Sequence, residues 1–371
     1  MEPDPRNPDD PTFVRPEVVH PTTSPQPGVQ KIVIEQPGGM FGRLGKFLLA
    51  ALVISLMFNF SQRAARDSYF DDSAEVVEKY HSGAKSATDK VAILSVEGAL
   101  LDGDGFVKQQ IDQIRRDKDV KAIVLRVDSP GGTVTASDYV YHHLNQLTDD
   151  RQIPLVVSMG SICASGGYYV AMAVGDQHDA IFAEPTTWTG SIGVIIPHYD
   201  ASGLLDSWNV KDDSIASHKF KQLGSPTRSL SEEDRAAERA ILQSLVDDSF
   251  EGFKDVVRSG RPMFRDSDAA LDKVATGQIF TANQALDAGL VDKIGFIEEA
   301  IDRATELAAL PSDKVRVVKY ESKATNLGEV LFGGQARAGG LRGLGLQQLL
   351  DLTAPRAYYL STWLPAVLSS N

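Results

Sequence analysis

The sequence predicts an α/β fold in which parallel strands are joined by crossover helices. From residue 90 onwards, short apolar runs of strand length alternate with segments of helical spacing. The helical segments are about 10–15 residues long, and helices of that length between strands are typical of parallel β–α–β units. Several of the apolar runs end in glycine-bearing turns. These observations together favour a layered α/β architecture.

The first predicted elements follow one another between residues 91 and 170. The strands are "VAILSVEG" (91–98), "KAIVLRVDSPGG" (121–132), which ends in a turn, and "IPLVVSMG" (153–160). Between the first two, "GFVKQQIDQIRRD" (105–117) has the apolar spacing of a helix, with Phe106, Val107, Ile111 and Ile114 on one side. "TASDYVYHHLNQL" (135–147) is helical in the same way, and an apolar helix begins at Ser165.

Two later helices begin at capping boxes. Ser231 with Asp234 precedes a long amphipathic segment that ends near Gly260. Thr281 with Gln284 begins a shorter helix, which Gly289 closes. The α/β pattern therefore continues beyond the first three strands.

Composition and charge exclude several classes of function. The 371 residues are 42% apolar, which suffices for one large α/β domain or two smaller ones. The formal net charge is −13, and nucleic-acid binding would require clustered Lys and Arg. Cys163 is the single cysteine, so no intramolecular disulfide framework exists. The sequence contains no H-E-x-x-H, C-x-x-C or P-loop motif, so we expect neither a metal nor another cofactor.

The N-terminal part predicts a membrane anchor behind a disordered tail. Nine of the 18 prolines lie within the first 37 residues, so we expect residues 1–42 to be a disordered Pro-rich tail. Residues 47–60 carry no charge, and with their neighbours they predict an uncleaved transmembrane signal anchor at 43–62. A cleavable signal peptide or a buried soluble helix are the alternatives. The polar residues 63–88 are predicted to form a stalk.

Glycine-bearing turns at the strand ends raise the question of catalysis. Ser165 could simply cap its helix, because serine is a preferred N-cap residue. However, "RVDSPGG" (126–132) ends the preceding strand, and its Gly132 N–H could bind a substrate oxyanion together with the Gly166 N–H. "TGSIGV" (189–194) is a third turn of this kind. The combination favours a serine nucleophile beside an anion site.

A nucleophilic serine requires a base, and the residues leave two choices open. His178, His198 and His218 all follow the serine in the chain. A neutral lysine is the other choice, because burial can depress the pKa of a lysine enough for it to act as a base. "ASHKFKQLGSP" offers Lys219 and Lys221.

Five motifs follow one another along the chain: "RVDSPGG", "CASGGYYVA", "TGSIGV", "FKQLGSPTR" and "GQIFTANQALDAGLVDKIG". In these motifs and their order the chain resembles the signal peptide peptidase A family, also called protease IV, and the resemblance covers roughly residues 90–320. It implies a Clp-protease/crotonase-like fold of layered parallel sheets, with a serine peptidase domain at 89–325. A Gly-rich and apolar C-terminal tail at 326–371 lies outside the resemblance.

The resemblance also implies roles for individual residues. Ser165 would be the nucleophile, and Lys221 rather than Lys219 would be the general base. Gly132 and Gly166 would donate to the oxyanion, and Ser191 would hold the lysine amine in place. Two departures stand out: the connection "VGDQHDAIFAEP" is about four residues longer than usual, and His218 stands where glycine is common.

The function implied is that of a membrane-anchored serine endopeptidase. It would hydrolyse cleaved signal peptides and other apolar peptides through an acyl-enzyme, on the extracytoplasmic side of the bacterial cytoplasmic membrane. The length fits the short form, in which protomers of a homo-oligomer share their active sites. A non-catalytic membrane scaffold of the same fold is the alternative. A crotonase-type acyl-CoA enzyme is a further one, although it would place a carboxylate where Ser165 stands.

Overall fold

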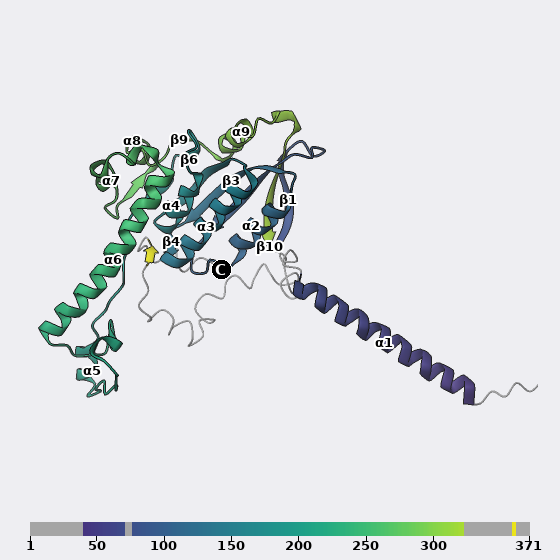
Figure 1. Ribbon diagram of the computed structural model, residues 1–371, viewed down its shortest axis with the longest axis horizontal. Coiled ribbons are helices and arrows are strands. Elements are labelled where there is room, and N and C mark those ends of the chain that lie inside the picture. Colours follow the sequence, from purple (N-terminus) through teal and green to yellow (C-terminus); the bar gives the residue numbers. More distant parts are fainter. Residues whose placement is uncertain (1–39, 71–75, 323–357, 361–371) are drawn as a thin grey trace, which may run out of the picture. The chain divides into compact units, whose positions relative to one another are not determined.

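The computed structural model describes residues 40–70, 76–322 and 358–360 (Figure 1). The chain forms two compact units, one ending at Asp67 and the other beginning at Ser68. The first contains all but the last three residues of helix α1 (Met40–Phe70), whose segment Leu44–Arg63 has 20 residues and a mean hydropathy of 1.8. This segment is long and apolar enough to cross a membrane, and it contains most of the anchor predicted at 43–62. The predicted tail lies, up to residue 39, outside the described residues.

The second unit is built on a mainly parallel sheet. Its strand order is β1-β10-β2-β3-β5-β6-β9, with β7 beside β5 and β8 beside β7. The strands are β1 (Val76–Gly83), β2 (Lys90–Glu97), β3 (Val120–Ser129), β5 (Leu155–Ala164), β6 (Ile181–Ala183), β7 (Trp188–Gly190), β8 (Ile279–Thr281), β9 (Lys293–Ile294) and β10 (Arg316–Ser322). The β1–β10 and β7–β8 pairs are antiparallel and the other pairs of this sheet are parallel. The predicted parallel α/β class is confirmed.

Helices connect the strands and cover the sheet. They are α2 (Phe106–Arg116), α3 (Val134–Arg151), α4 (Gly166–Ala171), α5 (Ser202–Ser207), α6 (Glu232–Gly260), α7 (Asp268–Val274), α8 (Ala282–Asp287) and α9 (Ile297–Leu307), with short 3-10 turns η2 (Met172–Val174), η3 (Lys219–Gln222), η4 (Pro262–Phe264) and η5 (Ser312–Lys314). The crossovers α2 and α3 lie side by side over the sheet (Figure 1). Strands β2, β3 and β5 are buried almost throughout, as expected for strands covered on both faces.

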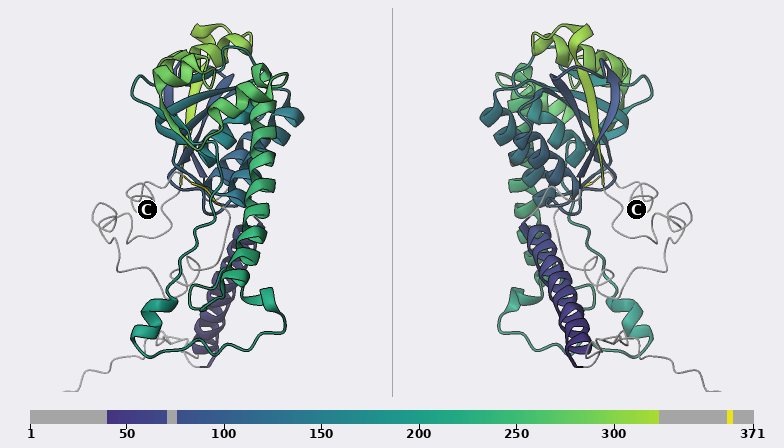
Figure 2. Two further views of the ribbon diagram at one scale, coloured as in Figure 1. Left: turned by 90° about the vertical axis from the view of Figure 1, so that its left-hand side faces the viewer. Right: turned by 90° about the vertical axis from the view of Figure 1, so that its right-hand side faces the viewer.

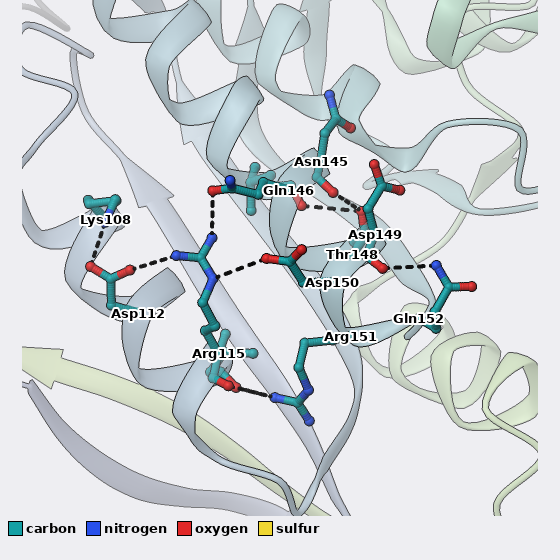
Figure 3. Close-up of polar contacts among 12 residues, drawn as sticks. Lys108, Asp112, Arg115, Asn145, Gln146, Thr148, Asp149, Asp150, Arg151 and Gln152 are labelled. Atoms are coloured by element: carbon teal, nitrogen blue, oxygen red, sulfur yellow. Dashed lines mark hydrogen bonds and ion pairs between the residues drawn. The ribbon is translucent and has the colours of Figure 1, made fainter.

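The α2–α3 pair is fixed by an arginine that satisfies free carbonyls at the end of a helix. The guanidinium of Arg151 donates to the carbonyls of Ile114 (2.6 Å), Asp117 (2.9 Å) and Val120 (2.9 Å). Figure 3 shows this side chain beside Arg115. The last carbonyls of a helix have no partner within it, so a cation here stabilises the end of α2 and the turn into β3. Beside it, Arg115 reaches Gln146 of α3 at 3.2 Å. The crossover that leads into β3 is thereby held against α3.

Both predicted capping boxes lie at helix starts. The side chain of Ser231 accepts from the amide of Asp234, and α6 runs from Glu232 to Gly260 as expected. Thr281 and Gln284 form a complete capping box at α8. The 29 residues of α6 span about 43 Å at 1.5 Å per residue. Its C-terminal half packs on the core, whereas its N-terminal half extends away from the sheet and has α5 beside it (Figures 1 and 2).

Two predicted boundaries differ from the structure. Residues 76–83, expected within the stalk at 63–88, form the edge strand β1, because β10 provides an antiparallel partner from Val76 to Gly83. The sheet therefore begins before the expected domain start at 89. Within the expected tail at 326–371, Tyr358–Leu360 forms strand β11 and pairs with β4 (Gly131–Thr133). Residues 326–357 and 361–371 of that range lie outside the described residues.

Candidate active site

Ser165 lies at the junction of β5 and α4 in a strained conformation. Its φ is +54° and its ψ is −117°, a region that non-glycine residues rarely adopt. The amide of Ser165 donates to Gly190 O at 2.8 Å, and its carbonyl accepts from Tyr169 N at 2.9 Å. Two backbone bonds therefore hold the turn on both sides of the serine. Such strain persists only where the surroundings over-determine it, and it is concentrated at functional sites.

The hydroxyl of Ser165 is buried and unpaired. The residue is 1% exposed, and its Oγ has no hydrogen-bond partner among the described residues. It makes no capping bond to α4, so it does not act as a side-chain N-cap. A buried polar atom without a partner is costly, so a missing donor or acceptor is expected at this position.

The SPGG turn meets Ser165 through glycines that leave no room for a side chain. Gly131 has a φ of +103°, and a Cβ on it would lie 2.7 Å from Gly166 N and 3.0 Å from Ser165 Cβ. A Cβ on Gly166 would lie 2.3 Å from Ser137 Oγ and 3.0 Å from Gly132 N. The structure therefore brings Ser165, Gly132 and Gly166 together, as the sequence predicts.

The third glycine turn adjoins the same place. β7 pairs in parallel with the end of β5, with Thr189 opposite Cys163 and Gly190 opposite Ala164. Ser191 follows directly, with a φ of +51° and 8% exposure, and its amide donates to Gln278 O at 2.7 Å. Since Gly190 O accepts from the Ser165 amide, Ser191 is one residue away from a direct contact of Ser165.

Lys221 is not brought to Ser165 within one chain. It lies in η3, within the segment 195–231, which we name the arm. η3 is attached to the start of α6 through Lys219, whose ammonium lies 2.6 Å from Asp234. Farther along α6, Phe253 packs against the helix that follows Ser165: its ring lies 5.2 Å from that of Tyr169 of α4. Asp234 and Phe253 are separated by about 28 Å of helix.

The two lysines of η3 differ in their surroundings. The hydrogen bond to Asp234 raises the pKa of Lys219, which keeps this ammonium charged. Lys221 is exposed, and its ammonium has no hydrogen bond or ion pair with any described residue. The histidines at 178, 198 and 218 are exposed as well, and none contacts the Ser165 hydroxyl. Within one chain, neither kind of predicted base touches the serine.

Sequence reasoning missed the short strand β11, which lies against these turns. Tyr359 is opposite Gly132 in antiparallel register, and its carbonyl oxygen lies 2.1 Å from where a Gly131 Cβ would be. On its other side, Tyr358 exchanges two backbone hydrogen bonds with Ile195, at 2.9 and 3.0 Å. The segment is thus an extended peptide held between two backbones, with one carbonyl beside Gly132, Gly166 and Ser165. The aromatic run "AYYL" was its only signal in the sequence.

The side chain of Tyr359 fills an aromatic pocket. The residue is 2% exposed, and its ring lies 5.0 Å from that of Tyr169 and 4.6 Å from that of Phe253. The hydroxyl donates to Ser249 O at 2.8 Å, and burial raises the pKa of this phenol. Tyr169 is held in turn by a bond from its hydroxyl to Asp138 at 2.9 Å.

A groove continues from Ile195 along the N-terminal half of α6. It has a volume of about 500 Å³, and its wall combines apolar residues of the arm and of α6 with a few charged ones. The lining includes Ile195, Pro197, Tyr199, Leu230, Leu242 and Val246. Ile195 pairs with the backbone of Tyr358 and also lines the groove, so the groove begins next to β11.

Several known proteins are similar to this chain in sequence. The family model of peptidase family S49 matches residues 148–311. The chain is 40% identical to "Putative protease slr0021" of Synechocystis sp. over 64% of this chain and 80% of that protein. It is 33% identical to "Putative signal peptide peptidase SppA" of Enterococcus faecium, over 71% and 76%. With "Serine protease SPPA, chloroplastic" of Arabidopsis thaliana it shares 30% identity, over 69% of this chain and 38% of that longer protein.

Proposed function

Because the chain belongs to peptidase family S49, a family of serine proteases, we propose that Ser165 is its nucleophile and Lys221 its general base. The protein then acts as a membrane-anchored serine endopeptidase. It hydrolyses apolar peptides, including cleaved signal peptides, through an acyl-enzyme.

The Ser165 hydroxyl is the observation that carries this proposal. It is buried, lacks a partner among the described residues and belongs to a residue with a positive φ. It lies beside two glycine amides and an extended backbone whose carbonyl lies near both of them. A serine that served only packing would need neither the strain nor the unpaired hydroxyl.

The mechanism follows from these positions. The neutral Lys221 amine takes the proton of Ser165 Oγ as that oxygen attacks the peptide carbonyl carbon. The Gly132 and Gly166 N–H groups stabilise the negative oxygen of the tetrahedral intermediate. The lysinium then protonates the leaving amine, the C–N bond breaks, and an acyl-serine remains. Water, deprotonated by the same amine, attacks the acyl carbon. The ester bond to Ser165 Oγ then breaks, the lysinium returns the proton to that oxygen, and the acid is released.

In this mechanism, Lys221 comes from a neighbouring copy of the chain. The start of α6, where η3 is attached, is far from Ser165, and Lys221 has no partner of its own in the described residues. The arm also exposes large apolar side chains, among them Trp208 and Ile215, that a second copy would cover. Burial in such an interface favours the neutral form of an amine. Ser191 would then hold the amine beside Ser165.

Membrane attachment supports an apolar substrate class. α1 contains a segment able to cross a membrane, and the groove beside Ile195 is largely apolar. A relative bears the name of a signal peptide peptidase. We place the peptidase unit on the extracytoplasmic side of the bacterial cytoplasmic membrane, where cleaved signal peptides are released, with the residues before α1 on the other side.

Peptide hydrolysis by the purified full-length chain in detergent tests the proposal. The wild type is compared with Ser165→Ala and Lys221→Ala, and Lys219→Ala is the matched control from the same turn. We expect both dyad variants to lose at least ~1000-fold in kcat, because each residue acts only as part of the unit. Lys219→Ala should stay within about two-fold, since its partner is an exposed carboxylate.

Each remaining outcome has a definite meaning. If the Ser165→Ala variant cleaved the peptide at the wild-type rate, the proposal would be overturned. Activity in Lys221→Ala together with loss in Lys219→Ala would move the base to Lys219. No cleavage by any of the four, with oligomers of unchanged size, would favour a non-catalytic scaffold.

A further inference from the structure

Strand β5 contains a bulge shortly before Ser165. Opposite the single residue Asp128 of β3, β5 has three residues, 160–162, between its regular pairs with that strand. On its other edge, β5 pairs with β6 before the bulge and with β7 after it. The bulge thus carries the strand from one neighbour to the next, and bulges beside active sites are a common way to re-aim a side chain.

The side chain of Asp128 fills this bulge. Its Oδ1 accepts one hydrogen bond from the Ser161 hydroxyl at 2.7 Å and another from the Ile162 amide at 3.1 Å. Its Oδ2 lies 2.8 Å from where a Cβ on Gly160 would be, so any side chain at that position would crowd the carboxylate. One carboxylate of β3 therefore adjoins all three residues of the bulge.

Two threonines hold the same part of β5 from its other edge. The hydroxyl of Thr187 donates to Gly160 O at 2.6 Å, and the hydroxyl of Thr189 donates to Cys163 O at 2.6 Å. Both threonines are fully buried, so water does not compete for these bonds. The bulge is thus fixed from both neighbouring strands, with Asp128 as the only charged group among these contacts.

We propose that Asp128 is a positioning residue for catalysis, which fixes the bulge of β5 and so aims the Ser165 hydroxyl at the substrate carbonyl. The path is short, because β5 ends one residue before Ser165, whose amide donates to Gly190 of β7. Asp128 makes no bond to the Ser165 hydroxyl, which lacks a partner in the described part of the chain, so it acts through the backbone of β5. The inference rests on the proposed function, because it takes Ser165 to be the nucleophile.

The strained backbone of Ser165 explains why such support is needed. A serine with a φ of +54° and a ψ of −117° relaxes unless its surroundings prevent it. The bulge is where that relaxation could be absorbed, since its residues lie outside the regular ladder. Loss of the carboxylate would leave the Ile162 amide without this partner and let the end of β5 shift. A shift of about 1 Å in a catalytic group can lower a rate by about 100-fold.

The test measures kcat, KM and melting temperature for the full-length chain in detergent. In Asp128→Ala both bonds are lost, and kcat should fall by about 30- to 100-fold. KM should stay within about two-fold, because peptides are expected to pair with β4 and not with the bulge. Asp128→Asn can still accept both bonds through its amide oxygen, although without the charge, so its kcat should stay within about five-fold of the wild type.

Ser161→Ala tests the same contact without a change in β3 or in the SPGG turn. It removes one of the two bonds to Asp128, so kcat should fall by about 3- to 10-fold. In the Asp128→Ala background it should have no further effect, because its partner is already absent.

Asp292→Asn is the matched control for a general loss of stability. Oδ2 of Asp292 also accepts two backbone amides of a neighbouring segment, at 2.9 Å each, but at the start of β6, away from the bulge. Its Oδ1 pairs with the buried Arg261 at 2.6 Å, so the variant should lower the melting temperature at least as much as Asp128→Ala does. Its kcat should stay within about two-fold of the wild type.

Three results would overturn the inference and leave the peptidase standing. They are an unchanged kcat in Asp128→Ala, a loss of kcat that Asp292→Asn equals, and an equal loss in Asp128→Ala and Asp128→Asn. The last would mean that the negative charge matters and the hydrogen bonds do not.

Failure of the proposed function gives a different result. Cleavage of no peptide by the wild type, or cleavage that survives Ser165→Ala, would overturn that function. Amide exchange over residues 160–166 tests the hold of Asp128 on β5 in either case. Asp128→Ala should raise this exchange by at least ~10-fold, and unchanged exchange would show that Asp128 does not fix the strand.

Discussion

The turns around Ser165 and the arm at 195–231 belong to the same compact unit, yet they are held in opposite ways. Around Ser165, strands β3, β5 and β7 end together, and backbone hydrogen bonds fix both the serine and its glycine neighbours. In the arm, every residue of η3 is exposed or half-buried, and attachment to α6 depends on ion pairs such as Arg228–Glu238 and Arg235–Asp200.

If the proposed mechanism holds, the chain fixes one half of its site by itself, and a neighbouring copy must position the other half. The proposed nucleophile, the proposed oxyanion donors and strand β11 form the fixed half, because strained residues persist only where their surroundings over-determine them. The lysine is on a segment with little burial of its own, so a neighbouring copy can position it. Catalysis would then require assembly, and an isolated protomer would keep an intact but inert serine.

Mixing inactive variants gives the largest expected effect and tests the comparison directly. Ser165→Ala and Lys221→Ala protomers are each expected to be inactive, by at least ~1000-fold. Co-assembled in equal amounts, they should recover about a quarter of the wild-type rate, since that fraction of random neighbour pairs combines an intact serine with an intact lysine. Activity is measured after subunit exchange and after separate storage of the two proteins. No recovery despite proven exchange would place serine and lysine in the same chain.

A side chain at Gly131, in the turn beside Ser165, should nearly abolish activity. Gly131→Ala places a Cβ 2.1 Å from the peptide carbonyl position and 2.7 Å from Gly166 N, at a φ of +103°. We expect kcat to fall by at least ~100-fold and stability to fall by about 2–4 kcal/mol. Enzyme assays and thermal unfolding measure both quantities.

The matched control for Gly131 is Gly175→Ala. Gly175 also has a positive φ, +64°, but nothing lies within 4 Å of its Cβ position. This variant should cost about 1–2 kcal/mol from backbone strain alone and leave kcat within about two-fold. Equal activity losses in both variants would mean that strain, and not access to the oxyanion site, controls the reaction.

Removing the ring of Tyr359 should raise activity moderately. β11 lies where a substrate is expected to bind, so the segment competes with added peptides as a tethered ligand. Tyr359→Ala empties the pocket and should raise kcat/KM by about 10-fold. Tyr358→Ala keeps the backbone bonds to Ile195 and leaves the pocket filled, so it should change little. A lowered kcat/KM with a large drop in melting temperature would show that β11 is a structural strand.

Sequence patterns predicted the central strands, two helix starts and the turns around Ser165 better than the short strands at the periphery. The apolar runs at 91–98, 121–132 and 153–160 became β2, β3 and β5, because a buried parallel strand leaves a short, uniform signal. The capping boxes at Ser231 and Thr281 marked helix starts because capping is chemistry between near neighbours in the chain. The meeting of Ser165 with Gly132 and Gly166 followed from the rule that parallel strands end at one edge.

What the sequence did not reveal depends on long-range pairing. β1 looked like a polar stalk, because its partner β10 lies more than 230 residues later and one face of an edge strand is polar. β11 has three residues, which is too few for any periodicity. The distance between Lys221 and Ser165 depends on the direction of α6, which no local pattern specifies.

The smallest effect that we expect is a rise in amide exchange within the arm when Asp200 is replaced. Asp200 accepts hydrogen bonds from the Ser202 hydroxyl (2.6 Å), the Ser202 amide (3.0 Å) and Arg235 (2.8 Å), and these bonds lower the pKa of its carboxyl well below the usual range. Their stabilising effect is therefore complete above the ordinary aspartate pKa and is lost only as the pH falls through the depressed value. Between pH 5 and 8 the contribution of Asp200 to the attachment of the arm should not depend on pH.

Asp200→Asn should mimic in part, at neutral pH, the loosening that acid causes in the wild type. Because exposed pairs contribute little, amide exchange in 195–231 should rise by only about 2- to 5-fold, while residues 126–170 keep their protection. Hydrogen–deuterium exchange with mass spectrometry measures both segments in one experiment. Exchange that also rises around Ser165 would mean that the arm and the turns around Ser165 are coupled within one chain. The view that the two regions are held independently of each other would then have to be abandoned.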